Sequence, residues 1–495
     1  MASLLLILSF IFLVLFLLKK SSTHSSASTK RLPPSPLKLP IIGNIHLAGS
    51  LPHRSFHSLS KRYGELMLLQ FGSKPVVVAS SANAAREIMK NQDQIFASRP
   101  RLSIPYRLCY SGRDVAFCAY GDQWRQNRSM CVLQMLNHKR VQSFRPIREE
   151  ETSLMIEKMK RSSPAVVNLS KMFMDLANDV VCRAVLGRKY DGDDDGEKHF
   201  NQILKKIVVI LQSYNVGDFV PWLGWINRVN GVEAEVENVF KMLDEFLECV
   251  LREYRMKKLS DDAVVNFVDA LLQFQRESKD SDPVDDDQIK ALILDMLAAG
   301  IDTTFTVLEW TMAELIRNPR TMKLLQTEVR NKNEININED DVDNMPYLKA
   351  VSKESLRLHP PLPLAVPREL TQDTNLLGYD IPRGTVVLVN CWAISRDPLL
   401  WENPNEFLPE RFFDTSIDYK GLHFEMIPFG AGRRGCPGIG FAMSLYELAI
   451  SRLVNEFNFE LPNGVREEDL DMTEAPGFAV HRKHPLLVVT TPRAT

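Results

Sequence analysis

The chain has 495 residues, of which 45% are apolar and 25% are charged, and this composition is typical of a folded globular protein. Its 60 Lys and Arg residues nearly balance its 62 Asp and Glu residues, so a net charge of −2 gives no basic field that would bind nucleic acid. The seven cysteines are scattered and form no C-x-x-C pair, which disfavours a disulfide framework and a zinc finger.

The first predicted element is an apolar segment over residues 2–18, interrupted only by Ser3 and Ser9. As a helix, these 17 residues would span about 26 Å, close to the roughly 27 Å core of the endoplasmic reticulum bilayer. Lysines follow the segment and none precedes it, which disfavours a cleaved signal peptide and puts the body of the protein in the cytosol. The sequence therefore predicts a single-pass anchor in the endoplasmic reticulum membrane.

A linker and a large domain are predicted after the anchor. A Ser/Thr-rich stretch followed by prolines between residues 33 and 36 predicts a linker and proline-rich hinge over residues 19–40. No further linker, internal repeat or low-complexity block divides residues 41–495, which we expect to form one domain. Within it, apolar runs at 66–71 and 75–79 predict a hairpin, and Ser81 can cap a helix over 82–90.

Helical patterns dominate the rest of the chain. The longest lies between Pro283 and Pro319, a stretch without proline that is long enough to cross the whole domain. Weaker strand signals recur at 385–389 and 486–491. The expected fold class is mainly α with small β-sheets.

Two short motifs resemble binding loops but lack part of the required pattern. Residues 191–196 match the first half of a calcium loop, but Gln202 stands where the bidentate glutamate is needed, which favours a solvated acidic loop. Gly430, Gly432 and Gly435 match the glycine pattern of dinucleotide-binding folds, but only 60 residues follow them, too few for such a fold.

Cys436 lies directly after this glycine-rich stretch and before an amphipathic helix. Pro437 suits the first helical position, so we expect Cys436 at the N-cap, where the helix dipole and free backbone N–H groups favour a thiolate. A lone thiolate cannot complete a zinc site but can be the single axial ligand of a haem iron. The alternative for any lone cysteine is a small buried hydrophobe, and we apply it to the other six.

Residues Phe429 to Gly438 match the cysteine-loop signature F-x-x-G-x-R-x-C-x-G of the cytochrome P450 superfamily at every fixed position. Four further motifs follow the family's order: Trp124–Arg128, Ala299–Thr304, Glu354–Arg357 and Pro409–Phe412. The chain therefore resembles the plant microsomal, A-type cytochromes P450 of specialised metabolism. The resemblance implies the cytochrome P450 fold, with a haem b held by the Cys436 thiolate.

The resemblance also implies roles for single residues. The expected cofactor-binding residues, which hold the haem and its propionates, are Trp124, Arg128, Arg368, Phe429, Arg434 and Gly438. Asp302 and Thr303 would deliver protons to iron-bound dioxygen, with Ala299, Gly300 and Thr303 forming one small-residue face of the long helix. Without the resemblance, Asp302 would read as an exposed acid and Thr303 as a helix threonine bonded to its own backbone.

A structural cluster and a substrate wall complete the expected site. Glu354, Arg357 and Arg411 would form a buried ion-pair cluster that holds the cysteine loop, although Glu354 and Arg357 alone could be a surface pair. The expected substrate wall is apolar and indicates a hydrophobic small molecule such as a terpenoid, an alkaloid or an aromatic amino-acid derivative. Its residues are Phe117, Ala298, Ala299, Leu364, Val366, Gly477, Phe478 and Ala479.

The sequence predicts a membrane-anchored haem-thiolate monooxygenase that hydroxylates or oxidatively cyclises a plant metabolite. Electrons from NADPH would arrive through a separate NADPH–cytochrome P450 reductase or a cytochrome b-type donor, and Arg125, Lys139, Arg140 and Arg433 could form its docking patch. Two alternatives stay open: aldoxime dehydration without net oxygen insertion, and a haem-binding sensor or scaffold without turnover. The presence of both Asp302 and Thr303 favours oxygen insertion.

Overall fold

The computed structural model describes residues 30–163, 165–190, 195–211, 215–256, 265–278, 283–331 and 337–493. The predicted anchor at 2–18, most of the predicted linker and residues 191–194 of the acidic loop lie outside the described residues. Within them, α14 (Asp286–Arg317) is the single helix long and apolar enough to cross a membrane, but 67% of its most apolar window is buried inside the protein. It is therefore a core helix.

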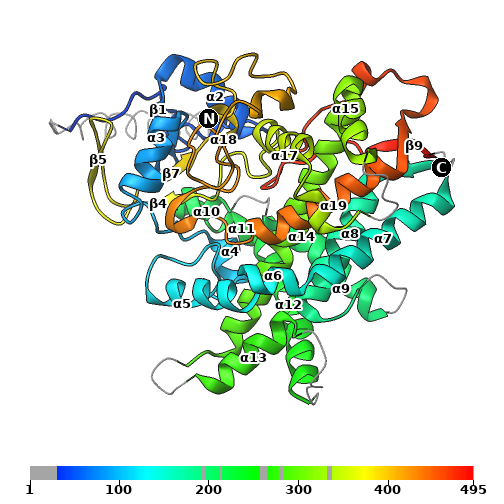
Figure 1. Ribbon diagram of the computed structural model, residues 1–495. Coiled ribbons are helices and arrows are strands. Elements are labelled where there is room, and N and C mark those ends of the chain that lie inside the picture. The colour runs from blue at the N-terminus through cyan, green and yellow to red at the C-terminus, as the bar shows by residue number, and fades with distance from the viewer. Residues whose placement is uncertain are drawn as a thin grey trace, which may run out of the picture.

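The described chain is mainly helical, with its small sheets gathered at two edges of the helical body (Figure 1). The helices other than α14 are α2 (Pro52–Tyr63), α3 (Ala82–Arg86), α4 (Ser103–Leu108), α5 (Asp122–Cys131), α6 (His138–Ser143), α7 (Arg145–Ser162), α8 (Leu169–Leu186), α9 (Asp195–Leu211), α10 (Val216–Phe219), α11 (Ile226–Val229), α12 (Val232–Met256), α13 (Phe267–Glu277), α15 (Pro319–Arg330), α16 (Glu339–Val342), α17 (Pro346–Leu358), α18 (Cys391–Ile394) and α19 (Ile439–Glu456).

In the described part of the chain, three small sheets accompany the helices. The first has the order β1-β2-β7-β4, and its strands are β1 (Leu66–Phe71), β2 (Lys74–Ala79), β4 (Arg368–Glu369) and β7 (Val386–Val389). The second has the order β3-β9-β8 and is antiparallel, with β3 (Val166–Asn168), β8 (Phe457–Glu460) and β9 (Leu487–Pro492). The third is the hairpin of β5 (Thr374–Leu376) and β6 (Tyr379–Ile381). The predicted fold class, mainly α with small β-sheets, is confirmed.

Local predictions hold well in the first sheet. The predicted hairpin forms as β1 and β2, which pair antiparallel with Leu66 opposite Ala79. Ser81 caps α3, since its hydroxyl accepts a hydrogen bond from the backbone N–H of Ala84 over 3.1 Å. The helix predicted over 82–90 is not uniform, because α3 ends at Arg86 and a π-helical turn continues over residues 87–91.

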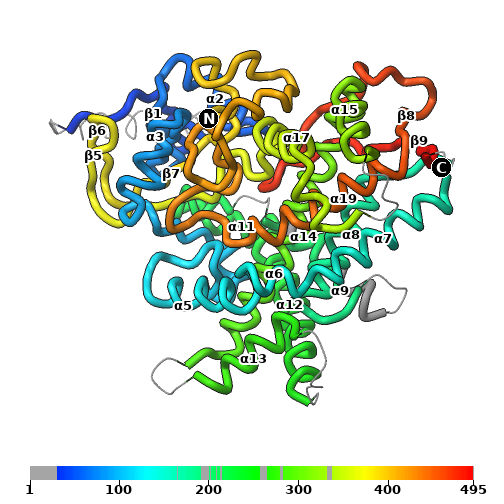
Figure 2. The backbone as a smooth tube through the Cα atoms, in the orientation of Figure 1, coloured from blue at the N-terminus to red at the C-terminus, as the bar shows by residue number. Residues whose placement is uncertain are grey.

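The core lies around α14, which packs along α8 and also contacts α13, α17 and α19. In Figure 2, α19 crosses α14 near the centre of the molecule. The hydroxyls of Thr311 on α14 and Tyr446 on α19 are 2.9 Å apart. The fold thereby packs the helix that follows Cys436 against the long helix that carries Thr303, although the two helices are far apart in the chain.

Candidate functional site

The glycine-rich loop before α19 adopts a conformation that requires glycine. Gly432 has a φ of 68°, and a side chain there would collide with the carbonyl oxygen of Met89. Gly430 has a φ of 66°, and a Cβ at that position would meet nothing within 4 Å. The loop closes when the backbone N–H of Cys436 donates to the carbonyl of Phe429 over 2.9 Å. These contacts fix the direction of the Cys436 side chain.

The start of the helix after Cys436 differs from the prediction. α19 begins at Ile439 with Gly438 as its N-cap, so Cys436 lies two residues before the cap and not on it. The physical reason is a short turn in which the backbone N–H of Gly438 donates to the sulfur of Cys436 over 3.3 Å. Because this N–H is directed at the sulfur, the helix starts after it.

The Cys436 thiol lies deep in the protein but keeps exposed surface. Burial raises its pKa, and the Gly438 N–H and the charge of Arg128 oppose this rise only in part. The expected thiolate is therefore not favoured by the protein alone, because desolvation outweighs the Gly438 N–H and the charge of Arg128. A cation bound to the sulfur would reverse this balance, since a coordinating thiol is deprotonated. The sulfur is therefore desolvated by the surrounding protein and still keeps exposed surface.

The middle of α14 also has exposed surface, as Cys436 does. Ala299 is exposed and Thr303 is partly exposed, although most of the surrounding helix is buried. Both lie on one face, at i and i+4, and the hydroxyl of Thr303 donates to the carbonyl of Ala299 over 2.7 Å. Gly300 does not belong to this face, which corrects the sequence-based expectation. A Cβ at Gly300 would lie 3.2 Å from Cγ2 of Val181, so this glycine allows α8 to approach α14.

The apolar residues predicted for the substrate wall keep partial exposure, with one exception. Phe117, Ala298, Leu364 and Val366 are partly exposed, and Phe478 is 37% exposed. The rings of Phe117 and Phe478 face each other with centroids 6.0 Å apart, which brings two distant segments together. Ala479 is buried and packs inward. The exposed apolar surface suits an uncharged ligand.

Three arginines, Arg99, Arg368 and Arg434, form a buried cluster, and the charge of the buried Asp114 acts on Arg99 and Arg434. Burial, followed by the charges of Arg434 and Arg368, lowers the pKa of Arg99, and burial lowers the pKa of Arg368 and of Arg434 to about 10. Among the residues that the structure describes, none of the three forms a salt bridge. Nη1 of Arg368 is buried and has no hydrogen-bond partner there. Such a cluster suits an anionic group, because buried charges are costly unless they are paired.

The other donors of the cluster are directed at backbone carbonyls. Arg434 donates to Ala97, Val115 and Cys118 over 2.6 to 3.0 Å, and Arg99 donates to Ala116, Val366 and Pro367 over 2.7 to 2.9 Å. The sequence analysis missed Arg99. It stands before a proline in a segment without helical or strand periodicity, so nothing in the local pattern distinguishes it from a surface arginine.

α5 joins the cluster to the cysteine loop. The indole N–H of Trp124 donates to the carbonyl of Val115 over 3.2 Å, and the guanidinium of Arg434 lies 4.3 Å from the centre of the Trp124 ring. Arg128, one turn further along α5, donates to the carbonyl of Gly435 over 2.8 Å. Trp124 and Arg128 share one face of α5, as their spacing predicted, and both lie close to Arg434 or to the cysteine loop.

The predicted ion-pair cluster is present and buried. Arg357 donates two hydrogen bonds to the carboxylate of Glu354, over 2.6 and 2.8 Å, and both side chains are 0% exposed. Arg411 donates to the same carboxylate over 3.1 Å. Arg357 also donates to the carbonyls of Ser395 and Pro404, which lie on the segment that leads to the cysteine loop. The interpretation of Glu354 and Arg357 as a surface ion pair is therefore wrong.

Asp302 is the neighbour of Thr303 on α14 and is only partly exposed. Burial raises its pKa, and His481 is the charged group that opposes this rise. The exposed-acid reading of Asp302 is therefore wrong. The sequence analysis did not single out His481, because a lone histidine in an irregular segment carries no signal.

These residues fit a haem. The exposed sulfur of Cys436 would ligate the iron, the exposed Ala299 would face the haem with a small side chain, and the arginine cluster would pair with two carboxylate groups. Two features support this fit: Nη1 of Arg368 is buried without a hydrogen-bond partner, and the sulfur of Cys436 keeps exposed surface.

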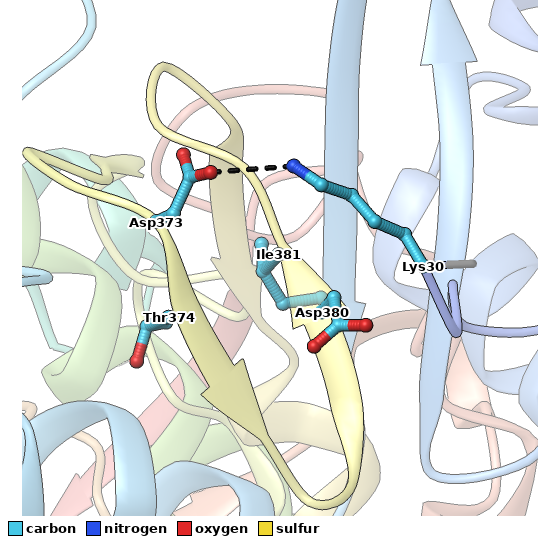
Figure 3. A pocket seen from close by; sticks show the side chains of 5 residues that line it. All are labelled: Lys30, Asp373, Thr374, Asp380 and Ile381. Atoms are coloured by element: carbon cyan, nitrogen blue, oxygen red, sulfur yellow. Dashed lines mark hydrogen bonds and ion pairs between the residues drawn. The ribbon is translucent and has the colours of Figure 1, made fainter. Parts of the chain in front are cut away.

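A small pocket elsewhere on the molecule is lined by Lys30, Asp373, Thr374, Asp380 and Ile381 (Figure 3). Lys30 pairs with Asp373 over 3.3 Å, and the backbone N–H of Arg31 donates to Asp380 over 2.9 Å. These contacts tie the end of the linker to the β5–β6 hairpin. The pocket shares no residue with the site around Cys436.

Comparisons with known proteins agree with this geometry. The family model described as Cytochrome P450 matches residues 33–489. The chain is 69% identical to the (+)-menthofuran synthase of Mentha piperita over 496 residues, with 100% of both chains covered. It is 56% identical to cytochrome P450 71A6 of Nepeta racemosa, with 97% of both chains covered, and 46% identical to the tabersonine/lochnericine 19-hydroxylase of Catharanthus roseus, with 94% of both covered.

Solved structures show the same fold. A zebrafish cytochrome P450 in complex with abiraterone superposes with a TM-score of 0.77 at 27% sequence identity, covering 90% of this chain and 99% of the other. A zebrafish cytochrome P450 structure with progesterone gives a TM-score of 0.77 at 28% identity, covering 89% of this chain and 99% of the other.

Proposed function

Because the chain belongs to the cytochrome P450 family and is a monooxygenase, we propose that it oxidises an uncharged terpenoid of plant specialised metabolism. In this proposal, residues 2–18 anchor it in the endoplasmic reticulum membrane, residues 19–40 form the linker, and residues 41–495 form the catalytic domain on the cytosolic side. The observation that carries the proposal is the exposed sulfur of the otherwise desolvated Cys436, beside a buried arginine cluster.

Members of this family carry a haem whose iron has a cysteine thiolate as axial ligand. In this chain Cys436 would hold the iron, and the propionates would pair with the cluster and α5. The residues proposed for this pairing are Arg99, Trp124, Arg128, Arg368 and Arg434. When bound, the haem supplies the reduction of dioxygen and the insertion of one oxygen atom into the substrate.

The protein's own residues would prepare this chemistry. The hydroxyl of Thr303 donates to the carbonyl of Ala299. It can also rotate to offer a hydrogen bond at the exposed face of α14. Asp302 would serve as the proton donor, because burial raises its pKa. The apolar surfaces of Phe117 and Phe478 would orient the substrate and exclude water.

Electrons from NADPH would arrive through a separate reductase. In support, Arg125 and Arg433 are exposed on α5 and on the cysteine loop, which both contact the arginine cluster. They are not free charges, because Arg125 pairs with Asp122 and Arg433 pairs with Asp93. An acidic surface of the reductase would compete with these two carboxylates.

The sequence identities to relatives favour a terpenoid over an alkaloid as the substrate. The relative at 69% identity is named (+)-menthofuran synthase, whereas the norfluorocurarine oxidase of Strychnos is 47% identical. The six proposed wall residues carry no charged side chain, so an amine that is protonated at neutral pH would lose its hydration without gaining a partner. The proposed wall residues are Phe117, Ala298, Ala299, Leu364, Val366 and Phe478.

The test is turnover in microsomes that contain this protein and a plant reductase. Cyclic monoterpenes, their ketones and a set of alkaloids would be supplied singly, and products would be identified by mass spectrometry with labelled dioxygen. We expect one labelled oxygen atom per turnover in a terpenoid product and none with Cys436→Ser. Conversion of an added aldoxime to a nitrile, without consumption of NADPH or dioxygen, would instead favour the dehydratase reading.

A further inference from the structure

Residues 113–118 lie between α4 and α5 and form neither a helix nor a strand. We call them the 113–118 loop. Asp114 and Val115 of this loop are buried, whereas Phe117, which belongs to the proposed substrate wall, is partly exposed. Because the loop has no regular hydrogen-bond ladder, its buried backbone groups need partners elsewhere. These partners determine where the Phe117 ring lies.

Side chains of the arginine cluster and of α5 bind the carbonyl groups of the loop. The carbonyl of Val115 accepts hydrogen bonds from Arg434 over 3.0 Å and from the indole N–H of Trp124 over 3.2 Å. The carbonyl of Ala116 accepts one from Arg99 over 2.9 Å. All of these donors bind carbonyls, so they leave the backbone N–H groups of the loop to other partners.

Asp295 of α14 binds the N–H side of the loop. Its carboxylate accepts a hydrogen bond from the backbone N–H of Val115 over 2.5 Å. Burial, followed by the charge of Asp114, raises the pKa of Asp295, and hydrogen bonds from the N–H groups of Val115 and Ala116 oppose this rise. Asp295 is only 7% exposed. The buried carboxylate and the buried peptide group of Val115 therefore satisfy each other.

A turn inside the loop connects this anchor to the substrate wall. The backbone N–H of Phe117 donates to the carboxylate of Asp114 over 2.7 Å. Asp114 directly precedes Val115, so the turn is joined to α14 through the bond between Val115 and Asp295. The Phe117 ring faces that of Phe478 with centroids 6.0 Å apart. A displacement of Val115 would therefore move the Phe117 ring relative to Phe478.

Asp295 also lies on the face of α14 that carries the site. It stands four residues before Ala299, and positions i and i+4 of a helix share one face. Ala299 is exposed, whereas Asp295 is buried and bonded to the 113–118 loop. The helix that presents Ala299 and Thr303 thus also holds the loop that presents Phe117. This contact fixes the substrate wall relative to the proposed site of oxidation.

We propose that Asp295 is a positioning residue that holds Phe117 in the substrate wall and thereby selects which carbon of the substrate is oxidised. This inference rests on the proposed function, in which Phe117 contacts the substrate. A cyclic terpenoid has several oxidisable carbons of similar reactivity, so the wall that orients the ring selects among them. Asp295 itself acts only through the loop.

The first test compares Asp295→Ala with Asp287→Ala, a matched control. Asp287 is exposed on the same helix, so the same substitution there leaves the 113–118 loop untouched. Limonene and menthone, an uncharged cyclic monoterpene and a cyclic ketone, would be supplied with reductase after the carbon monoxide difference spectrum has verified an intact haem site. We expect the ratio of the main product to all other products to fall roughly tenfold in Asp295→Ala and to stay unchanged in Asp287→Ala.

A conservative variant and a double variant separate positioning from general stability. Asp295→Asn keeps one acceptor oxygen for the N–H of Val115 and should restore much of the wild-type product ratio. In a Phe117→Ala background, Asp295→Ala should change the ratio little further, because Asp295 acts through Phe117. A wild-type product ratio in Asp295→Ala would overturn the proposal. An equal effect of Asp295→Ala with and without the Phe117 ring would also overturn it.

A second measurement does not depend on turnover. Hydrogen–deuterium exchange of the full-length, substrate-free holoprotein would be followed by mass spectrometry in peptides that cover residues 113–118. The Val115 amide should exchange roughly tenfold faster in Asp295→Ala, at an intermediate rate in Asp295→Asn and at the wild-type rate in Asp287→Ala. Unchanged exchange in Asp295→Ala would overturn the proposal. Faster exchange together with no oxidation of either compound by the wild type would instead overturn the proposed function.

Discussion

Arg357 and Glu354 lie one helical turn apart on α17 and form a two-point ion pair from which water is excluded. Removing one partner of a buried pair leaves a charge without compensation, so we expect Arg357→Ala to lose about 3 to 5 kcal/mol of unfolding free energy and to be recovered without haem. Denaturant unfolding and haem content would measure both effects. Arg320→Ala is the control, since Arg320 is 70% exposed in its pair with Glu410 and should contribute less than about 1 kcal/mol. A stable, haem-loaded Arg357→Ala protein would contradict this role.

Gly300 and Val181 determine how closely α8 and α14 pack. Gly300→Ala gains about 1 kcal/mol of helix propensity but brings its methyl group within 3.2 Å of Val181. We expect the contact to dominate, because overpacking a core costs about 1 to 3 kcal/mol. Unfolding free energies of Gly300→Ala, Val181→Ala and the double variant would test this. The double variant should be more stable than the sum of the single effects predicts, and strict additivity would argue against the contact.

Thr303 offers a hydroxyl at the exposed face of α14. Thr303→Ala should divert electrons into peroxide and lower product per NADPH by roughly tenfold, with little change in KM, because the hydroxyl acts on the proton and not on substrate binding. Thr303→Ser keeps the hydroxyl and should retain most of the coupling. The measurement is the ratio of product to peroxide with the reconstituted reductase. Equal coupling in Thr303→Ala and the wild type would count against the assignment.

A substitution in the arginine cluster should stabilise the haem-free protein and weaken the binding of haem. Arg368→Leu removes a buried, partly unpaired charge, so the haem-free protein should become more stable. The same change removes a charge-assisted hydrogen bond to a propionate, about 1.5 to 3 kcal/mol, and should weaken haem binding at least tenfold. Haem titration into the apoprotein would measure the second effect. Arg433→Leu, at an exposed position, should leave the affinity unchanged, and an unaffected Arg368→Leu protein would contradict the assignment.

The ionisation of Glu474 should make the stability of the protein depend on pH. Burial alone would raise its pKa, but hydrogen bonds from His53 and Arg54 outweigh burial and lower the pKa from 4.5 to about 2. A carboxylate whose pKa is lower in the folded state than in the unfolded state stabilises the fold fully at a pH above the unfolded-state pKa. This stabilisation is lost as the pH falls toward the folded-state pKa. Glu474→Gln should therefore lose about 3 kcal/mol at pH 7, with the difference from the wild type shrinking below pH 4.5. Thermal unfolding between pH 3 and 7 would show this convergence, and a constant difference would refute it.

Some of these features could be read from the sequence and others could not. The hairpin of β1 and β2 and the long α14 follow from local patterns, since alternation and the absence of proline act within a few residues. The burial of Glu354 does not follow from spacing, because an i, i+3 pair looks the same on a surface. It depended on the resemblance to a family.

The errors have a common cause in tertiary contacts. Cys436 was placed at the helix cap because Pro437 favours a first helical turn, but the sulfur takes up the N–H of Gly438 and delays the helix. Gly300 was assigned to the open face of α14, but its missing side chain faces Val181 of another helix. Arg99 and His481 were missed, since their partners come from segments far away in the chain.

The most direct test of the account is the carbon monoxide difference spectrum of the reduced, purified protein, compared between the wild type, Cys436→Ser and Cys249→Ser. Cys249 is exposed and serves as the control for losing a thiol. We predict that the wild type and Cys249→Ser show the red-shifted band of thiolate-ligated haem and that Cys436→Ser lacks it. The same band in Cys436→Ser would contradict the assignment of the sulfur as the ligand of the iron.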